Sequence, residues 1–206
     1  STASYEKVLE QEDLADAMRT STLYTLGQLH FHLENFEKAV GYLDQWLEVA
    51  DNPGPDPFIL KGQALYQLGR LDEAAEPVRR AIEVANTRGN KVQENWYALL
   101  RVIYFETEDY EKLLDVLEIL VTRYPAKEYW MHLASAFGEM GDTKRQLAAY
   151  EMAYAQGYLN SSTEIVLLGQ LLLQADVPYR AGVLLQEGLE SGAVTSNANN
   201  WRLLSQ

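Results

Sequence analysis

The chain has 206 residues, with 30 Asp and Glu against 17 Lys and Arg, so its net charge near neutral pH is −13. A chain this acidic is a poor candidate for binding a nucleic-acid backbone, which needs clustered Lys and Arg. The absence of cysteine excludes disulfides, thiolate catalysis and cysteine-based zinc sites. No apolar run approaches the ~18 residues that indicate a membrane span.

Helical periodicity runs along almost the whole chain. Residues at positions i, i+3, i+4 and i+7 form one face of a helix, and mainly apolar or small residues occupy this spacing in sets that begin at Leu23, Phe58, Tyr97, Trp130 and Ile165. The set from Phe58 matches three of the four positions, with Lys61 in the other. Six residues after the last member of each set, the apolar face of a second helix begins, at Phe36, Leu71, Tyr110, Thr143 and Pro178. The spacing therefore predicts five helix pairs in series.

One position of each first helix is small in four of the five pairs. It is occupied by Gly27, Gly62, Arg101, Ala134 and Gly169, which are separated by 35, 39, 33 and 35 residues. A small residue here lets the second helix approach the first closely. Arg101 departs from this rule, and a competing register through Trp96, Leu99, Leu100 and Ile103 stays open. We keep Arg101 because it preserves the spacing of six.

The pattern resembles the tetratricopeptide repeat family, whose 34-residue helix–turn–helix carries W-x2-L-G-x2-Y, A-x3-F and a closing Pro. Ala39, Ala74 and Ala181 match the Ala position of the second helix, and Pro125 matches the closing Pro. The resemblance implies an all-α, right-handed superhelix (a solenoid) of antiparallel helix pairs in a single domain, 1–206. We expect five full repeats, at about 20–53, 55–88, 94–127, 127–160 and 162–195.

Partial repeats are expected at 1–19 and 198–206, which predicts a fragment of a longer array. Two connections are predicted from turn residues. The segment 52–57 holds three prolines and is expected to be a stiff linker that no helix crosses. Asp176 is expected to cap a helix that has Pro178 in its first turn.

No pattern typical of catalysis or cofactor binding stands out. The three histidines, His30, His32 and His132, do not have metal-ligand spacing, and we interpret His30 as a core residue. Phosphate-binding glycine motifs and the G-x-S-x-G motif are absent from the sequence. We therefore expect no enzyme activity, no cofactor and no metal.

The remaining candidate is a binding surface. In repeat superhelices of this kind the first helices line the concave face, where ligands usually bind. One turn round from the core positions, the candidate peptide-binding groove would present Tyr24, Gln28, Phe31, Gln63, Tyr66, Val102, Phe105, Met131 and Gln170. Packing against the next repeat is the alternative role for these residues.

This groove is mixed aromatic, Gln-rich and acidic, and it suits an extended or helical peptide. It lacks the ladder of Lys and Arg with which chaperone-binding members of the family hold a C-terminal carboxylate. A neutral or basic protein segment is favoured instead, helped by the net charge of −13.

A narrower resemblance is to the tetratricopeptide repeat proteins that accompany TonB-type energy-transducing systems in Gram-negative bacteria. It rests on the segments at 22–26, 52–56, 94–96, 129–134, 144–150 and 177–181. This resemblance implies a periplasmic accessory of a TonB-type transport system. The absence of cysteine suits both periplasm and cytosol.

The leading hypothesis is thus a non-catalytic scaffold that binds another protein or peptide, with no nucleic acid and no direct membrane span. The alternative is a structural module that self-associates or packs end to end. A catalytic or enzyme-accessory domain is the third and weakest reading.

Overall fold

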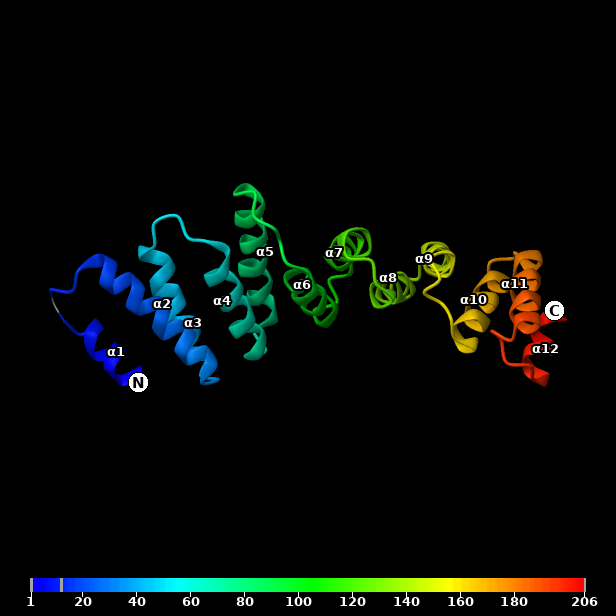
Figure 1. The fold of residues 1–206 in the computed structure, drawn as a ribbon, viewed down its shortest axis with the longest axis horizontal. Helices are drawn as coiled ribbons and strands as arrows, with labels where there is room; N and C mark the ends of the chain where they lie inside the picture. Colours follow the sequence, from blue (N-terminus) through cyan, green and yellow to red (C-terminus); the bar gives the residue numbers. More distant parts are fainter. Residues whose placement is uncertain (1, 12, 206) are drawn as a thin grey trace. The chain divides into compact units, whose positions relative to one another are not determined.

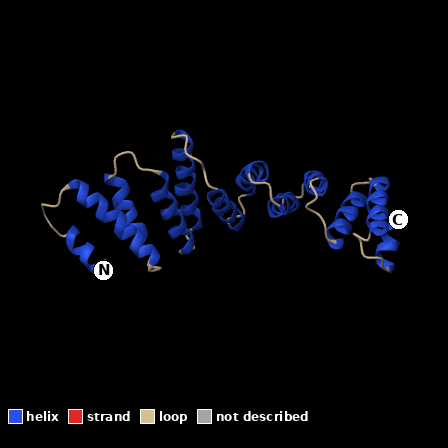
Figure 2. Ribbon diagram, viewed as in Figure 1, coloured by secondary structure: helices blue, strands red, loops and turns tan. Residues whose placement is uncertain are grey.

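The computed structural model describes residues 2–11 and 13–205, and every regular element in them is an α-helix (Figure 2). The described chain divides into two compact units, Ser1–Asp109 and Tyr110–Gln206. Unit 1 contains α1 (Thr2–Leu9), α2 (Asp16–His32), α3 (Phe36–Val49), α4 (Pro55–Gln67), α5 (Leu71–Thr87) and α6 (Glu94–Glu106). Unit 2 contains α7 (Tyr110–Arg123), α8 (Lys127–Glu139), α9 (Thr143–Ala155), α10 (Ser162–Gln174), α11 (Pro178–Ser191) and α12 (Ala198–Leu204).

Within each unit every helix packs against the next one along the chain (Figure 1). In unit 1, α2 also contacts α4, and α4 contacts α6, so the first helices of successive pairs are neighbours. The prediction of an all-α fold built from antiparallel helix pairs is confirmed. No helix in the described ranges is long and apolar enough to cross a membrane.

The turn inside each pair has the same backbone conformation. One residue adopts a left-handed φ of 55–71°, and these residues are Glu34, Gly69, Glu108, Gly141 and Asp176. The next N–H donates to the carbonyl five residues earlier, as from Asn35 to His30 at 2.8 Å and from Asp142 to Phe137 at 2.8 Å. This arrangement satisfies the last carbonyls of the first helix and reverses the chain within three residues.

The small positions of the first helices are sites of close contact. A Cβ atom on Gly27 would lie 3.0 Å from Leu43 Cγ, and one on Gly169 would lie 3.0 Å from Leu185 Cδ2. At Gly62 the added atom would overlap Val78 Cγ2. Each contact joins a first helix to the residue 16 positions later in the second helix, as the predicted spacing requires.

The burial pattern supports the register that retains Arg101. In α4 and α8 the buried sets include Ala64 and Leu65, and Ala136 and Phe137. The equivalent residues of α6 lie 39 positions after those of α4 and 33 positions before those of α8. They are Ile103 and Tyr104, and both are buried as well. The same spacing places Arg101 level with Gly62 and Ala134.

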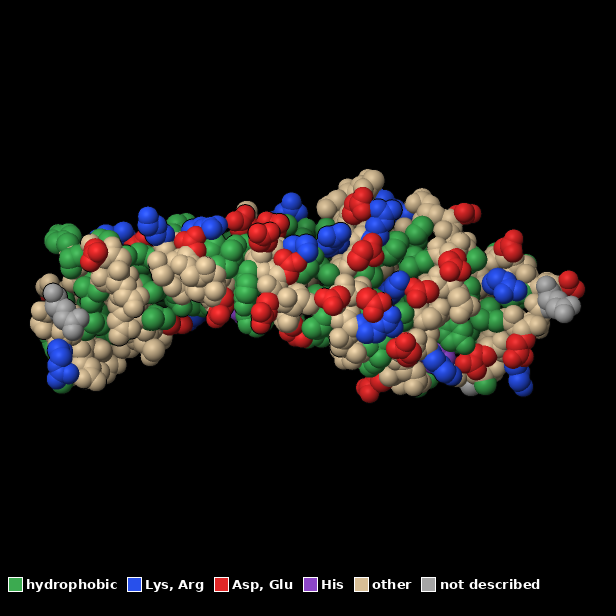
Figure 3. All heavy atoms as spheres, turned by 180° about the vertical axis from the view of Figure 1, so that it is seen from behind, with side chains coloured by type: hydrophobic (Ala, Val, Ile, Leu, Met, Phe, Trp, Pro, Cys, Tyr) green, Lys and Arg blue, Asp and Glu red, His purple; other side chains and the backbone are tan. Residues whose placement is uncertain are grey.

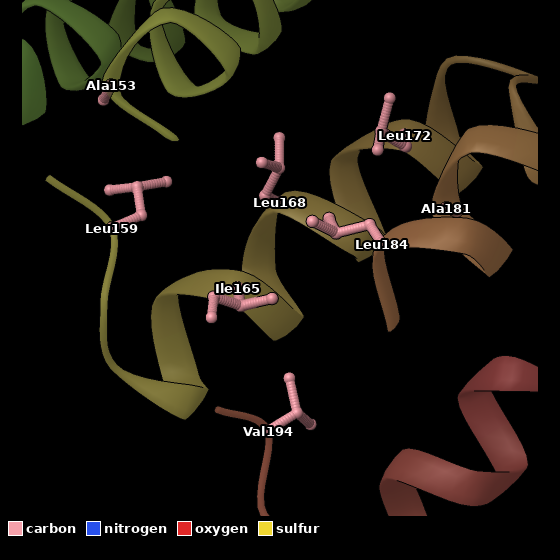
Figure 4. Close-up of a cluster of buried hydrophobic side chains, with 8 residues drawn as sticks. All are labelled: Ala153, Leu159, Ile165, Leu168, Leu172, Ala181, Leu184 and Val194. Carbon is pink, nitrogen blue, oxygen red and sulfur yellow. The ribbon is translucent and has the colours of Figure 1, made fainter. Parts of the chain in front are cut away.

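The core of unit 2 is a cluster of buried aliphatic side chains (Figure 4). Ile165, Leu168 and Leu172 of α10 meet Ala153 of α9, and Ala181 and Leu184 of α11. Two loop residues complete the cluster: Leu159 and Val194 are only 3% and 1% exposed.

Of the two turn predictions, one is confirmed and one is wrong in detail. No helix crosses the proline segment, because α3 ends at Val49 and α4 begins inside the segment at Pro55, with Pro57 buried in its first turn. Proline fits there, since the first N–H groups of a helix have no intrahelical partner. The N-cap of α11 is Val177 rather than Asp176, because Asp176 occupies the left-handed position of the preceding turn.

Candidate functional site

A surface hollow of about 480 Å³ lies on the first helices of unit 1. It is bounded by side chains from α2, α4 and α6, which are consecutive first helices of the repeat pattern. The lining residues are Phe31, Gln63, Tyr66, Gln67, Asn95, Ala98, Leu99, Arg101 and Val102. The hollow thus combines apolar surface with several amide groups and one guanidinium, a composition that suits a peptide.

Four of the sequence-predicted groove residues meet in this hollow: Phe31, Gln63, Tyr66 and Val102. Phe105 lies on α6 outside the lining set and is 51% exposed. Tyr24 is half-buried, because its ring packs 5.2 Å from the ring of Trp46. Burial is the main cause that raises the pKa of Tyr24, and Gln28, which hydrogen-bonds to it, has the opposite effect.

Tyr66 connects two of the helices that form the hollow. Its hydroxyl donates to Glu106 Oε1 at 3.0 Å, which joins α4 to α6. This hydrogen bond to a carboxylate is the largest cause of the raised pKa of Tyr66, followed by partial burial and the charge of Glu106. The tyrosine therefore stays protonated and holds one edge of the hollow in place.

Phe31, from α2, is held in the lining by aromatic contacts. Its ring lies edge-on to Phe36, with centroids 5.4 Å apart and planes at 70°. Edge-to-face rings at this separation are a favourable geometry. The side chain is therefore preorganised to offer part of its face to a ligand.

Sequence reasoning missed Arg101 and Asn95 as lining residues. Arg101 is half-buried, and its Nε atom is fully buried with no hydrogen-bond partner among the described residues. A buried donor without a partner is unfavourable and uncommon. The signal in the sequence is an arginine where the other repeats have Gly or Ala, but periodicity alone predicts only a departure from close packing at this position.

The two predicted groove residues of unit 2 have different environments. Met131 is half-buried and packs against the core cluster of that unit, so its side chain has a structural role. Gln170 is exposed and lines a smaller hollow of about 150 Å³ together with Asn199 and Arg202 from α12.

The histidines and acidic residues do not assemble into a metal centre: within the described ranges, no three His, Asp or Glu side chains could hold an ion. His30 is 3% exposed and stacks on Tyr42 with ring centroids 5.3 Å apart, and its Nε2 lies 3.4 Å from Glu6 Oε1. The interpretation of His30 as a core residue is confirmed.

On the face in Figure 3, Lys and Arg side chains lie scattered among Asp and Glu.

Residues 24–90 match the model of the tetratricopeptide repeat family. No curated protein matches the chain significantly in sequence. Among solved structures, the chain is similar to MamA AMB-1, with 17% identity over 89% of this chain and 96% of that one and a TM-score of 0.60.

A second MamA structure, from Desulfovibrio magneticus RS-1, is 18% identical over 84% of this chain and 94% of that one, with a TM-score of 0.56. A chain in the structure of Naa15/Naa10 bound to HypK-THB is 13% identical, with a TM-score of 0.69. It matches 98% of this chain, which spans 30% of its length. At these identities the similarity shows the fold alone, which is that of tetratricopeptide repeat proteins, as expected from the sequence.

Proposed function

We propose, from the tetratricopeptide repeat fold and the hollow of unit 1, that this chain is a non-catalytic scaffold that binds a protein or peptide segment. Repeat proteins of this kind present extended surfaces that bind other proteins. The observation that carries the proposal is the convergence of Phe31, Gln63, Tyr66 and Val102 from three first helices on one hollow.

The lining indicates how a segment would bind. Phe31, Leu99 and Val102 offer apolar surface, whereas the amides of Gln63, Gln67 and Asn95 can bond to the peptide groups of an extended chain. The Arg101 guanidinium can donate to backbone carbonyls of the same chain. Glu106 and the net charge of −13 favour a neutral or basic segment over an acidic one.

The test begins with peptides selected from a random display library on the wild-type chain. Replacing Phe31 and Tyr66, the two aromatic residues of the lining, together by Ala is expected to weaken their binding at least tenfold, since aromatic residues dominate interface energies. Fluorescence anisotropy of labelled peptides measures the Kd.

Tyr5→Ala is the matched control, because Tyr5 is 40% exposed on α1 and does not line the hollow. Unchanged binding by the double variant, with the same helical circular dichroism as wild type, would refute the groove.

We also propose that the scaffold is a periplasmic accessory of a TonB-type system, which the segments quoted above support by resemblance. In the native host, a photo-crosslinking residue at position 66 is expected to capture a component of that system. The same residue at position 5 is the control. Recovery of the chain solely from the cytosol, or equal crosslinking from both positions, would refute this assignment without affecting the peptide-binding test.

A further inference from the structure

Unit 2 carries a second hollow, of about 360 Å³, on a different set of helices. It is formed mainly by α9 and α11, the second helices of two successive pairs, with α10 between them. The hollow of unit 1 is formed by first helices instead. Nothing in the proposed function uses this second surface.

The floor of this hollow is the edge of the unit 2 core. Leu168 and Leu172 of α10 and Leu184 of α11 belong both to the buried cluster and to the lining of the hollow (Figure 4). These side chains are already packed and hold a rigid apolar base. A ligand group entering here therefore meets a preformed surface.

Large apolar side chains surround this floor without being buried by it. Tyr179 is 82% exposed, Val183 is 39% exposed and Tyr154 is 37% exposed. Single exposed apolar residues are common on proteins, but several around one hollow indicate an interaction site. Tyrosine is also enriched at interfaces, because it adds contact area at low entropic cost.

The charges at the rim favour a cation. Arg180 is paired with Glu151, with Nη2 and Oε1 2.6 Å apart, and this pair connects α11 to α9. Glu187 also lines the hollow, and among the described residues no side chain pairs with its carboxylate. Two carboxylates therefore stand against one guanidinium, on a chain of net charge −13.

We propose that this hollow is a second docking site, which takes a helical segment carrying one large apolar side chain and a Lys or Arg one turn away. The apolar side chain enters between Tyr154 and Tyr179 and rests on Leu168 and Leu184. The cation pairs with Glu187. A helix suits the geometry, because residues one turn apart share a face and can reach the hollow and its rim together.

The probe is a set of four amphipathic helical peptides of one framework. They carry Trp or Ser at the anchor position and Lys or Glu four residues later. The Trp–Lys peptide is expected to bind, with amide chemical-shift changes confined to α9, α10 and α11. The Trp–Glu peptide is expected to bind at least tenfold more weakly, and the Ser peptides not at all.

Two substitutions test the residues. Tyr179→Ala is expected to weaken binding of the Trp–Lys peptide at least tenfold. The Tyr179 side chain is too exposed to be needed for folding. Glu187→Lys is expected to abolish the preference for Lys over Glu. Glu190→Lys is the matched control, since it makes the same charge change on α11 outside the hollow.

Failure of all four peptides to bind, or equal binding of the Lys and Glu versions, overturns the proposal. Sedimentation of the free chain tests whether a second copy of the chain fills the hollow instead. A dimer that Tyr179→Ala converts to a monomer would show this, and it would also overturn the proposal. Phe31→Ala with Tyr66→Ala, the double variant of the unit 1 hollow, is expected to leave binding of the Trp–Lys peptide unchanged. The two sites can therefore fail independently.

Discussion

At the scale of single residues, glycine is used in this chain for close approach between helices. Gly62 of α4 leaves no room for a methyl group, because Val78 Cγ2 occupies that space and the Ala74 carbonyl oxygen would be 3.2 Å away. Val78 is β-branched and stiff about χ1 in a helix, so it cannot move aside easily. Gly41 of α3 has no atom within 4 Å of an added Cβ.

Gly62→Ala is therefore expected to destabilise the chain by about 1–3 kcal/mol, the usual range for overpacking. Gly41→Ala is the matched control and is expected to stabilise by up to about 1 kcal/mol, because Ala is the better helix former. Urea unfolding followed by circular dichroism measures both. Equal effects of the two substitutions would contradict the close contact.

The turns inside the pairs contain residues in an unfavourable conformation. Glu34, Glu108 and Asp176 have φ of 58°, 55° and 57°, where a Cβ atom is unfavourable, whereas Gly69 and Gly141 occupy the same position in the other pairs. Glu34→Gly is expected to stabilise the chain by roughly 1 kcal/mol relative to Glu34→Ala, which keeps a Cβ. If thermal unfolding gives the same stability for the Gly and Ala variants, backbone conformation is not the cause.

At the scale of elements, a capping box closes the N-terminus of α10. Ser161 accepts from the Glu164 N–H at 3.4 Å, and Glu164 accepts from the Ser161 N–H at 3.1 Å, which forms a capping box. Glu164 also pairs with Lys127 of α8, with Nζ and Oε1 2.6 Å apart. One carboxylate thus caps a helix and connects two first helices of unit 2.

This carboxylate predicts a specific pH dependence. The hydrogen bond from Lys127, aided by the bonds from Ser161, lowers the pKa of Glu164 from 4.5 to about 2. A depressed pKa means that the ionised form stabilises the folded state, so this contribution is complete above about pH 4.5 and is lost as the pH falls towards 2.

Glu164→Gln is therefore expected to lower stability at neutral pH and to reduce the further loss between about pH 5 and pH 2. The measurement is the free energy of unfolding as a function of pH. Glu128→Gln, on an exposed carboxylate of α8, is the control and should keep the wild-type pH dependence. If the stability of Glu164→Gln falls as much as that of wild type between about pH 5 and pH 2, the ionised Glu164 is not the source of this pH dependence.

At the scale of the whole molecule, the dominant property is the net charge of −13. A field of this sign attracts basic segments and repels acidic ones, and salt screens it. Raising the ionic strength from about 0.01 M to about 0.15 M shortens the screening length from about 30 Å to about 8 Å.

Peptides that carry Lys or Arg and bind unit 1 should therefore lose affinity with added salt, mainly through slower association. Neutral peptides with the same anchors are the control and should respond little. Stopped-flow association rates at several salt concentrations give the comparison. The same salt response for basic and neutral peptides would argue against any role of the acidic surface.

The sequence by itself determined the helices and their pairing. Helical periodicity, the spacing of six and the small positions at 27, 62 and 169 depend on contacts between residues close in sequence, and these contacts are present in the structure. It also identified Phe31, Gln63, Tyr66 and Val102 as surface residues of the first helices, because their angular position on a helix follows from the spacing alone.

Only the tertiary structure decided which surfaces are hollow and which are filled. In the folded chain Met131 packs against the core of unit 2, and the loop residues Leu159 and Val194 are part of that core. Tyr179 and Val183 stay exposed. The tertiary structure also brought Arg101 and Asn95 to the hollow of unit 1. Periodicity specifies the direction of a side chain from its own helix, whereas burial depends on how far the neighbouring helices reach, and that is set by the packing of every side chain between them.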